Sequence, residues 1–69
     1  MPWVETNTRR IVARLASEGW TNVGGGKHDK FVREGRPDVI IVVPRHKEQS
    51  NGVAREIARL AGWIWGLSP

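Results

Sequence analysis

One stretch of this sequence decides its fold: Asp38-Val39-Ile40-Ile41-Val42-Val43-Pro44. Five consecutive β-branched residues favour an extended backbone, and their apolar character predicts the central or best-buried strand of a sheet. Because proline has no backbone N–H, Pro44 is expected to stop the hydrogen-bonded ladder. The run is also far shorter than the roughly 18 apolar residues that a membrane-spanning helix needs, so we expect no membrane segment.

The residues before this stretch predict two further strands. Gly35-Arg36-Pro37 predicts a three-residue turn, and it follows an alternating segment at residues 28–34. Before that segment lie Gly24, Gly25 and Gly26, which predict a flexible hairpin loop after a short β-compatible segment at residues 20–23. Because short loops join all three strands, we expect an antiparallel meander.

Two amphipathic helices are expected outside the sheet. In the first, from Thr8 to Glu18, a cap at residues 6–8 and a stop at Gly19 enclose a helical stripe of apolar residues. Ser50 is expected to cap the second. The stripes are formed by Ile11, Val12, Leu15 and Ala16, and by Val53, Ile57, Leu60, Ala61 and Ile64. The sequence therefore predicts a single α+β domain over residues 1–69, of order αβββα, with both helices on one face of the sheet.

A three-residue turn would set the register between the last two strands. It would place Phe31 opposite Ile41, the bulkiest pair, which we assign to the face that the helices cover. It would also place Glu34 opposite Asp38 and Arg33 opposite Val39. At the other end of the two strands, it would place His28 opposite Pro44. The open face would then carry His28, Lys30, Val32, Ile40 and Val42. An apolar open face predicts a protein partner or self-association, unless residues 63–69 fold back over it.

Charge and composition point to a polyanionic ligand. The chain has 69 residues, a net charge of +4 and no cysteine, so neither disulfides nor thiolate metal sites are available. Six basic and three acidic residues lie between Lys27 and Lys47, so this segment carries most of the net positive charge. No signal sequence is recognisable, which predicts a cytoplasmic protein.

The two histidines lie within this basic segment. An imidazole both accepts and donates protons near neutral pH, so His28 is our candidate for proton transfer and His46 for an auxiliary role. Four cations are candidates for binding phosphate: Lys27, Lys30, Arg45 and Lys47. The competing interpretation of the same charges is a solvated surface. Two histidines without ligand spacing predict no metal site, and no cofactor is expected.

Four sequence segments, in order and spacing, resemble the HicA toxins of bacterial HicA/HicB toxin–antitoxin pairs. They are Glu18-Gly19-Trp20, Gly26-Lys27-His28-Asp29-Lys30-Phe31, Val43-Pro44-Arg45-His46-Lys47-Glu48, and a helix with Gly52, residues 55–57 and Ala61-Gly62. The resemblance covers residues 8–62 and leaves 63–69 as a C-terminal extension. It implies a fold like that of double-stranded-RNA-binding domains, and an mRNA interferase that arrests growth until a HicB antitoxin covers it. The family's catalytic histidine, in Gly-Ser-His, corresponds to His28, with Lys27 in place of the serine.

Three hypotheses about function follow. The first is a toxin acting as a metal-independent endoribonuclease, with His28 as the base that activates a ribose 2′-hydroxyl of mRNA. The second is a non-catalytic RNA-binding module, in which shape and phosphate contacts dominate. The third is a degenerate toxin that acts only through protein contacts of its apolar face.

Overall fold

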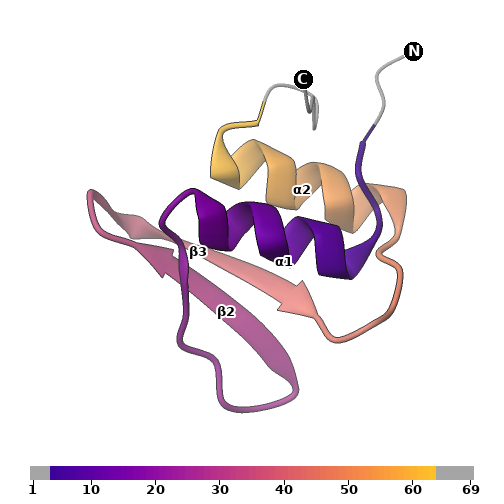
Figure 1. Cartoon of the computed structure of the whole chain (residues 1–69), viewed down its shortest axis with the longest axis horizontal. Helices are drawn as coiled ribbons and strands as arrows, with labels where there is room; N and C mark the ends of the chain where they lie inside the picture. The colour runs from indigo at the N-terminus through magenta and orange to yellow at the C-terminus, as the bar shows by residue number, and fades with distance from the viewer. Residues whose placement is uncertain (1–3, 64–69) are drawn as a thin grey trace.

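The computed structural model describes residues 4–63, which form two helices and one antiparallel sheet. The elements are α1 (Thr8–Ser17), β1 (Thr21–Asn22), β2 (His28–Arg33), β3 (Arg36–Pro44) and α2 (Asn51–Ala61). The predicted αβββα order is confirmed, and both helices lie on the same face of the sheet (Figure 1). Neither helix has the length and apolar character needed to cross a membrane.

The helix ends follow local capping chemistry. Of the three candidate caps for α1, the residue used is Asn7, whose side-chain oxygen accepts a hydrogen bond from the Arg10 N–H at 3.1 Å. Ser50 caps α2 as predicted, accepting from the Val53 N–H at 3.2 Å. α1 ends at Ser17, one residue earlier than predicted, and Gly19 follows in the left-handed region with a φ of 93°.

The core lies between the helices and the inner face of the sheet. Phe31, Ile41 and Val43 point from the sheet into this layer, and each is at least 98% buried. The predicted assignment of the Phe31–Ile41 face to the helices is therefore confirmed. Burying side chains of this size contributes about 1.5–3 kcal/mol each. The helices supply Ile11 and Leu15 from α1, and Ile57, Ala58 and Ala61 from α2.

The strand order is β1-β2-β3, so β2 is central and β3 lies at the edge of the sheet. At the ends of β2 and β3 that lie away from their connecting turn, the predicted register is confirmed. His28 pairs with Pro44, Asp29 with Val43, Lys30 with Val42, and Phe31 with Ile41. Residues 38–43 were expected to form the central or best-buried strand of the sheet. They lie on an edge strand, so the first alternative is wrong, but Ile41 and Val43 on it are fully buried.

Near the turn the predicted register is wrong. Arg33 lies opposite Arg36 rather than Val39, and β3 begins at Arg36, before the predicted start at Asp38. Only Glu34 and Gly35 remain in the turn, so Glu34 does not pair with Asp38. The cause is Gly35, whose φ of 91° is accessible to glycine and closes a two-residue loop. The additional β3 residues are absorbed by an irregularity that includes Pro37, a residue tolerated at edges and bulges.

The apolar part of the predicted open face consists mainly of two exposed side chains on β3. Ile40 is 55% and Val42 is 42% exposed, whereas Val32 is half-buried. Trp63, the first residue of the segment expected to cover this face, is instead buried in the core cluster. Its indole N–H donates to the Glu18 carboxylate at 2.6 Å. The rest of that segment, residues 64–69, lies outside the described residues.

Candidate active site

His28 occupies an exposed corner of the sheet. It is the first residue of β2 and pairs with Pro44, the last residue of β3. The glycine loop therefore enters the same end of the sheet from which residues 45–47 leave (Figure 1). Side chains two residues apart on a strand share a face, so Lys30 lies on the same side as His28, about 7 Å along β2. The structure thus places an imidazole and an ammonium group on one exposed surface.

The three glycines before His28 differ in their surroundings. A Cβ on Gly24 would lie 2.6 Å from the carbonyl oxygen of His28 and 2.7 Å from the backbone nitrogen of Lys30. Gly25 and Gly26 have nothing within 4 Å of that position. At Gly24 a side chain is therefore excluded by the backbone of β2, so that this glycine is part of the scaffold of His28. The prediction of a loop is confirmed; that it is flexible stays a prediction.

Hydrogen bonds hold the loop in this close approach. The Val23 N–H donates to the Lys30 carbonyl at 2.7 Å and extends the β1–β2 ladder past the end of β1. The Gly24 N–H donates to the Asn22 side-chain oxygen at 3.0 Å. Such a bond from a residue two positions further on is typical of a turn that asparagine stabilises. The backbone leading to His28 is consequently fixed before the loop opens at Gly25.

Arg45 connects the two chain segments that flank His28. Its guanidinium Nη2 lies 3.1 Å from the Asp29 carboxylate, and its Nε donates to the same oxygen at 3.2 Å. Asp29 follows His28 on β2 but points to the opposite face. A hydrogen bond from the Asn22 side chain, and then the Arg45 guanidinium, hold the pKa of Asp29 below its ordinary value. Arg45 therefore first serves to tie the loop after β3 to β2.

The three lysines of the predicted phosphate site have a different environment. Lys27, Lys30 and Lys47 are exposed, and none forms a salt bridge within residues 4–63. Lys27 lies in the loop before β2 and Lys47 in the loop after β3, on either side of the His28–Pro44 pair. These ammonium groups can exchange their water for a phosphate without first breaking an ion pair.

A buried glutamine fixes the loop that carries Arg45, His46 and Lys47. Gln49 is only 4% exposed, and its amide donates to the Pro44 carbonyl at 2.7 Å and to the Thr8 hydroxyl at 2.8 Å. No role was assigned to Gln49 from the sequence. No local pattern marks it, because its hydroxyl partner is 41 residues away in the sequence.

The same loop determines where His46 lies. The Thr8 hydroxyl donates to the His46 carbonyl, and the His46 N–H donates to the Pro44 carbonyl at 2.9 Å. The backbone of His46 is thus anchored while its side chain is exposed. In the described part of the chain no hydrogen bond joins the imidazoles of His28 and His46, and no group of three or more His, Asp or Glu side chains could hold a metal ion.

Comparison with known proteins assigns a family to this arrangement. Searches of curated proteins and of solved structures returned no significant match. A family model described as HicA toxin of bacterial toxin–antitoxin matches residues 8–63. The match spans all five elements of the fold, the glycine loop, His28 and the basic loop after β3. The chain therefore belongs to the HicA family, the toxins of bacterial toxin–antitoxin systems.

Proposed function

We propose that this toxin is a metal-independent endoribonuclease that cleaves mRNA in the cytoplasm with His28 as its catalytic base. One observation carries the proposal: in a chain of the HicA family, an exposed histidine corresponds to the family's catalytic position and shares its face with Lys30. The surrounding cations supply the attraction for an RNA backbone. The family also implies pairing with an antitoxin, which we expect to be a HicB-like protein.

The proposed reaction uses the substrate's own nucleophile. The His28 imidazole removes the proton from a ribose 2′-hydroxyl, and the 2′-oxygen attacks the adjacent phosphorus. The P–O5′ bond breaks as the new P–O2′ bond forms, which leaves a 2′,3′-cyclic phosphate. The departing 5′-oxygen takes a proton from His46 or from water. Electrons and atoms balance without an external oxidant, reductant or cofactor.

The lysines provide charge where the transition state needs it. Negative charge accumulates on the phosphate oxygens as phosphorus becomes five-coordinate, and a nearby cation stabilises that state more than the ground state. Lys30 is the best placed by strand geometry, because it lies on the His28 face of β2. Lys27 and Lys47 on the flanking loops would position the RNA backbone. Arg45 would bind the phosphate with the guanidinium N–H groups that do not contact Asp29.

The decisive experiment compares the purified wild-type chain with His28→Ala on a labelled RNA in the presence of EDTA. We expect cleavage by the wild type, a cyclic phosphate at the new 3′ end, and loss of product with His28→Ala. A 2′-deoxy substitution at the scissile nucleotide should also abolish cleavage, because it removes the nucleophile. The circular dichroism spectrum of His28→Ala should match the wild type, since the side chain is exposed.

His46→Ala is the matched control for removal of an exposed histidine. A partial loss would assign the leaving-group proton to His46, and full activity would assign it to water. Activity retained by His28→Ala would refute the catalytic assignment. Cleavage that disappears in EDTA would refute metal independence. RNA binding that weakens with salt but yields no product would instead identify the non-catalytic binding module.

A further inference from the structure

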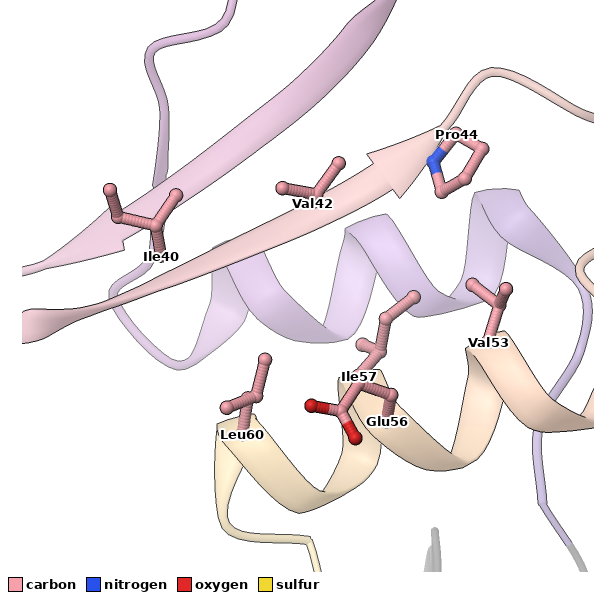
Figure 2. Close-up of a pocket in the computed structure, with 7 residues that line it drawn as sticks. All are labelled: Ile40, Val42, Pro44, Val53, Glu56, Ile57 and Leu60. Carbon is pink, nitrogen blue, oxygen red and sulfur yellow. The ribbon is translucent and has the colours of Figure 1, made fainter.

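An apolar groove runs along the free edge of the sheet. It lies between β3 and α2 and has a volume of about 310 Å³ (Figure 2). The two elements line it with Ile40, Val42 and Pro44 from β3, and Val53, Ile57 and Leu60 from α2. Figure 2 shows the β3 side chains above those of α2 along the length of the helix. No step of the proposed RNA chemistry uses this groove.

The backbone beside the groove is available for pairing. β3 lies at the end of the strand order, and no strand within residues 4–63 pairs with its outer side. An unpaired edge offers its N–H and C=O groups as a template for another strand, and natural proteins usually protect long edges. A strand added to β3 would also find an apolar wall on α2, so its side chains would be buried as its backbone paired.

The lining of the groove favours a protein over RNA. It contains no cation and no aromatic ring, which are the groups that hold phosphates and stack on bases. Its one charged residue is Glu56, which forms a salt bridge with Arg59. A carboxylate repels a nucleic-acid backbone. Aliphatic side chains along a free strand edge instead match a peptide that is apolar at alternate positions.

The charge changes at one end of the groove. Pro44, which lines this end, pairs with His28, and Val42 pairs with Lys30. Arg45 and Lys47 lie within three residues after Pro44 along the chain. A segment lying along β3 therefore meets apolar side chains over most of its length and cations at the end beside His28. Acidic residues at that end would complement the cations.

We propose that this groove binds an extended segment of a protein inhibitor, paired antiparallel to β3, with apolar residues at alternate positions and acidic residues over Pro44. The proposal rests on the proposed function in one respect, because it takes the inhibitor to be the antitoxin. The antiparallel direction is chosen because this ladder is slightly more stable per residue than the parallel one. In an antiparallel pairing, the acidic N-terminal end of the segment lies beside Pro44. It therefore covers the cations around His28 and blocks the binding of RNA.

The test uses a synthetic peptide, Asp-Asp-Val-Thr-Val-Thr-Val, and the full chain labelled with ¹⁵N. We expect saturable amide shifts in residues 39–43 and 53–60. A peptide with two lysines in place of the aspartates should bind about tenfold more weakly at low salt, and the difference should shrink as salt rises. This titration does not depend on nuclease activity, so it fails or succeeds independently of His28.

A matched pair of variants assigns the binding to the groove. Ile40→Thr combined with Val42→Thr keeps β-branched residues at two exposed positions but makes them polar, and should weaken peptide binding about tenfold. Val23→Thr makes the same change at a valine that is 59% exposed outside the groove, and should bind like the wild type. The double variant should cleave RNA normally and resist inhibition by the peptide.

Four results would overturn the proposal. The first is the absence of shifts in β3 and α2, and the second is equal binding of the aspartate and lysine peptides. The third is an RNA oligonucleotide that shifts the groove residues. The fourth is dimerisation of the chain alone, detected by sedimentation and abolished in the double variant, which would make a second copy the occupant.

Discussion

Replacing Gly24 with alanine tests how the scaffold holds His28. The added Cβ would lie 2.6 Å from the His28 carbonyl oxygen, well inside the 3.4 Å at which ordinary van der Waals contact begins. Neither contacting atom can rotate away, because both belong to the backbone of β2. Relieving an overpacked contact costs about 1–3 kcal/mol. Breaking the Val23–Lys30 hydrogen bond adds about 1 kcal/mol.

The expected loss of about 2–4 kcal/mol is large for this chain. At about 0.05–0.15 kcal/mol per residue, 69 residues give a free energy of unfolding of about 3–10 kcal/mol. Urea unfolding followed by tryptophan fluorescence would measure the loss, since Trp20 and Trp63 are both buried. We also expect weaker RNA cleavage by Gly24→Ala under conditions where it remains folded, because the shift displaces the backbone of His28.

Gly25→Ala is the matched control. Its Cβ meets nothing within 4 Å, and its φ is not among the positive values in the chain. This substitution should leave stability unchanged or raise it by up to about 1 kcal/mol, because alanine restricts the unfolded chain. Equal unfolding midpoints for Gly24→Ala and Gly25→Ala would refute the argument that Gly24 is required by its contact with β2.

Two further predictions concern the anchors of the site. Gln49→Leu should lower the free energy of unfolding by about 1–3 kcal/mol, because it removes the two hydrogen bonds that this buried amide donates to the Pro44 carbonyl and the Thr8 hydroxyl; an unchanged urea midpoint would contradict this. Asp29 has a pKa lowered by Asn22 and then by Arg45, so its contribution to stability is complete above the unfolded pKa near 3.8 and is lost as the pH falls through the lower folded value. Asp29→Asn should therefore reduce the loss of stability on acidification, measured by fluorescence; an unaltered acid transition would contradict it.

The parts of the fold that follow local rules were predictable from the sequence. Apolar periodicity predicts a helix because 3.6 residues complete a turn, and a cap such as Ser50 acts within three residues of itself. The face on which Phe31 and Ile41 lie was also predictable, because the bulkiest opposed pair of side chains belongs on the buried face. Each of these signals depends either on residues close together in the sequence or on one pair of side chains being larger than the other pairs.

The turn between β2 and β3 shows where local reasoning stopped. Gly35-Arg36-Pro37 is compatible with a three-residue turn, whereas the structure uses Glu34 and Gly35. Both choices preserve the pairing near His28, because the irregularity in β3 absorbs the difference. The position of His28 beside Pro44 could thus be predicted although the turn that joins their strands was wrong.

The roles of the cations in the site could be predicted only in part from the sequence. Their clustering between Lys27 and Lys47 is visible in the sequence, but their division of roles is not. Asp29 engages Arg45 across the strand pair, while the lysines have no such partner in the described chain. Ion pairs between segments 16 residues apart depend on register, which composition does not reveal.

The edge of β3 connects these separate features. The hydrogen bonds of Gln49 hold Pro44 and the loop at residues 45–47 in place, and Pro44 pairs with His28 on the neighbouring strand. The groove reaches the same proline from the other direction. A segment that occupies the groove up to Pro44 therefore reaches the edge of the proposed RNA site, since Pro44 lines the groove and also pairs with His28. A protein bound there would block the proposed RNA site without contacting the imidazole, by covering the cations around His28.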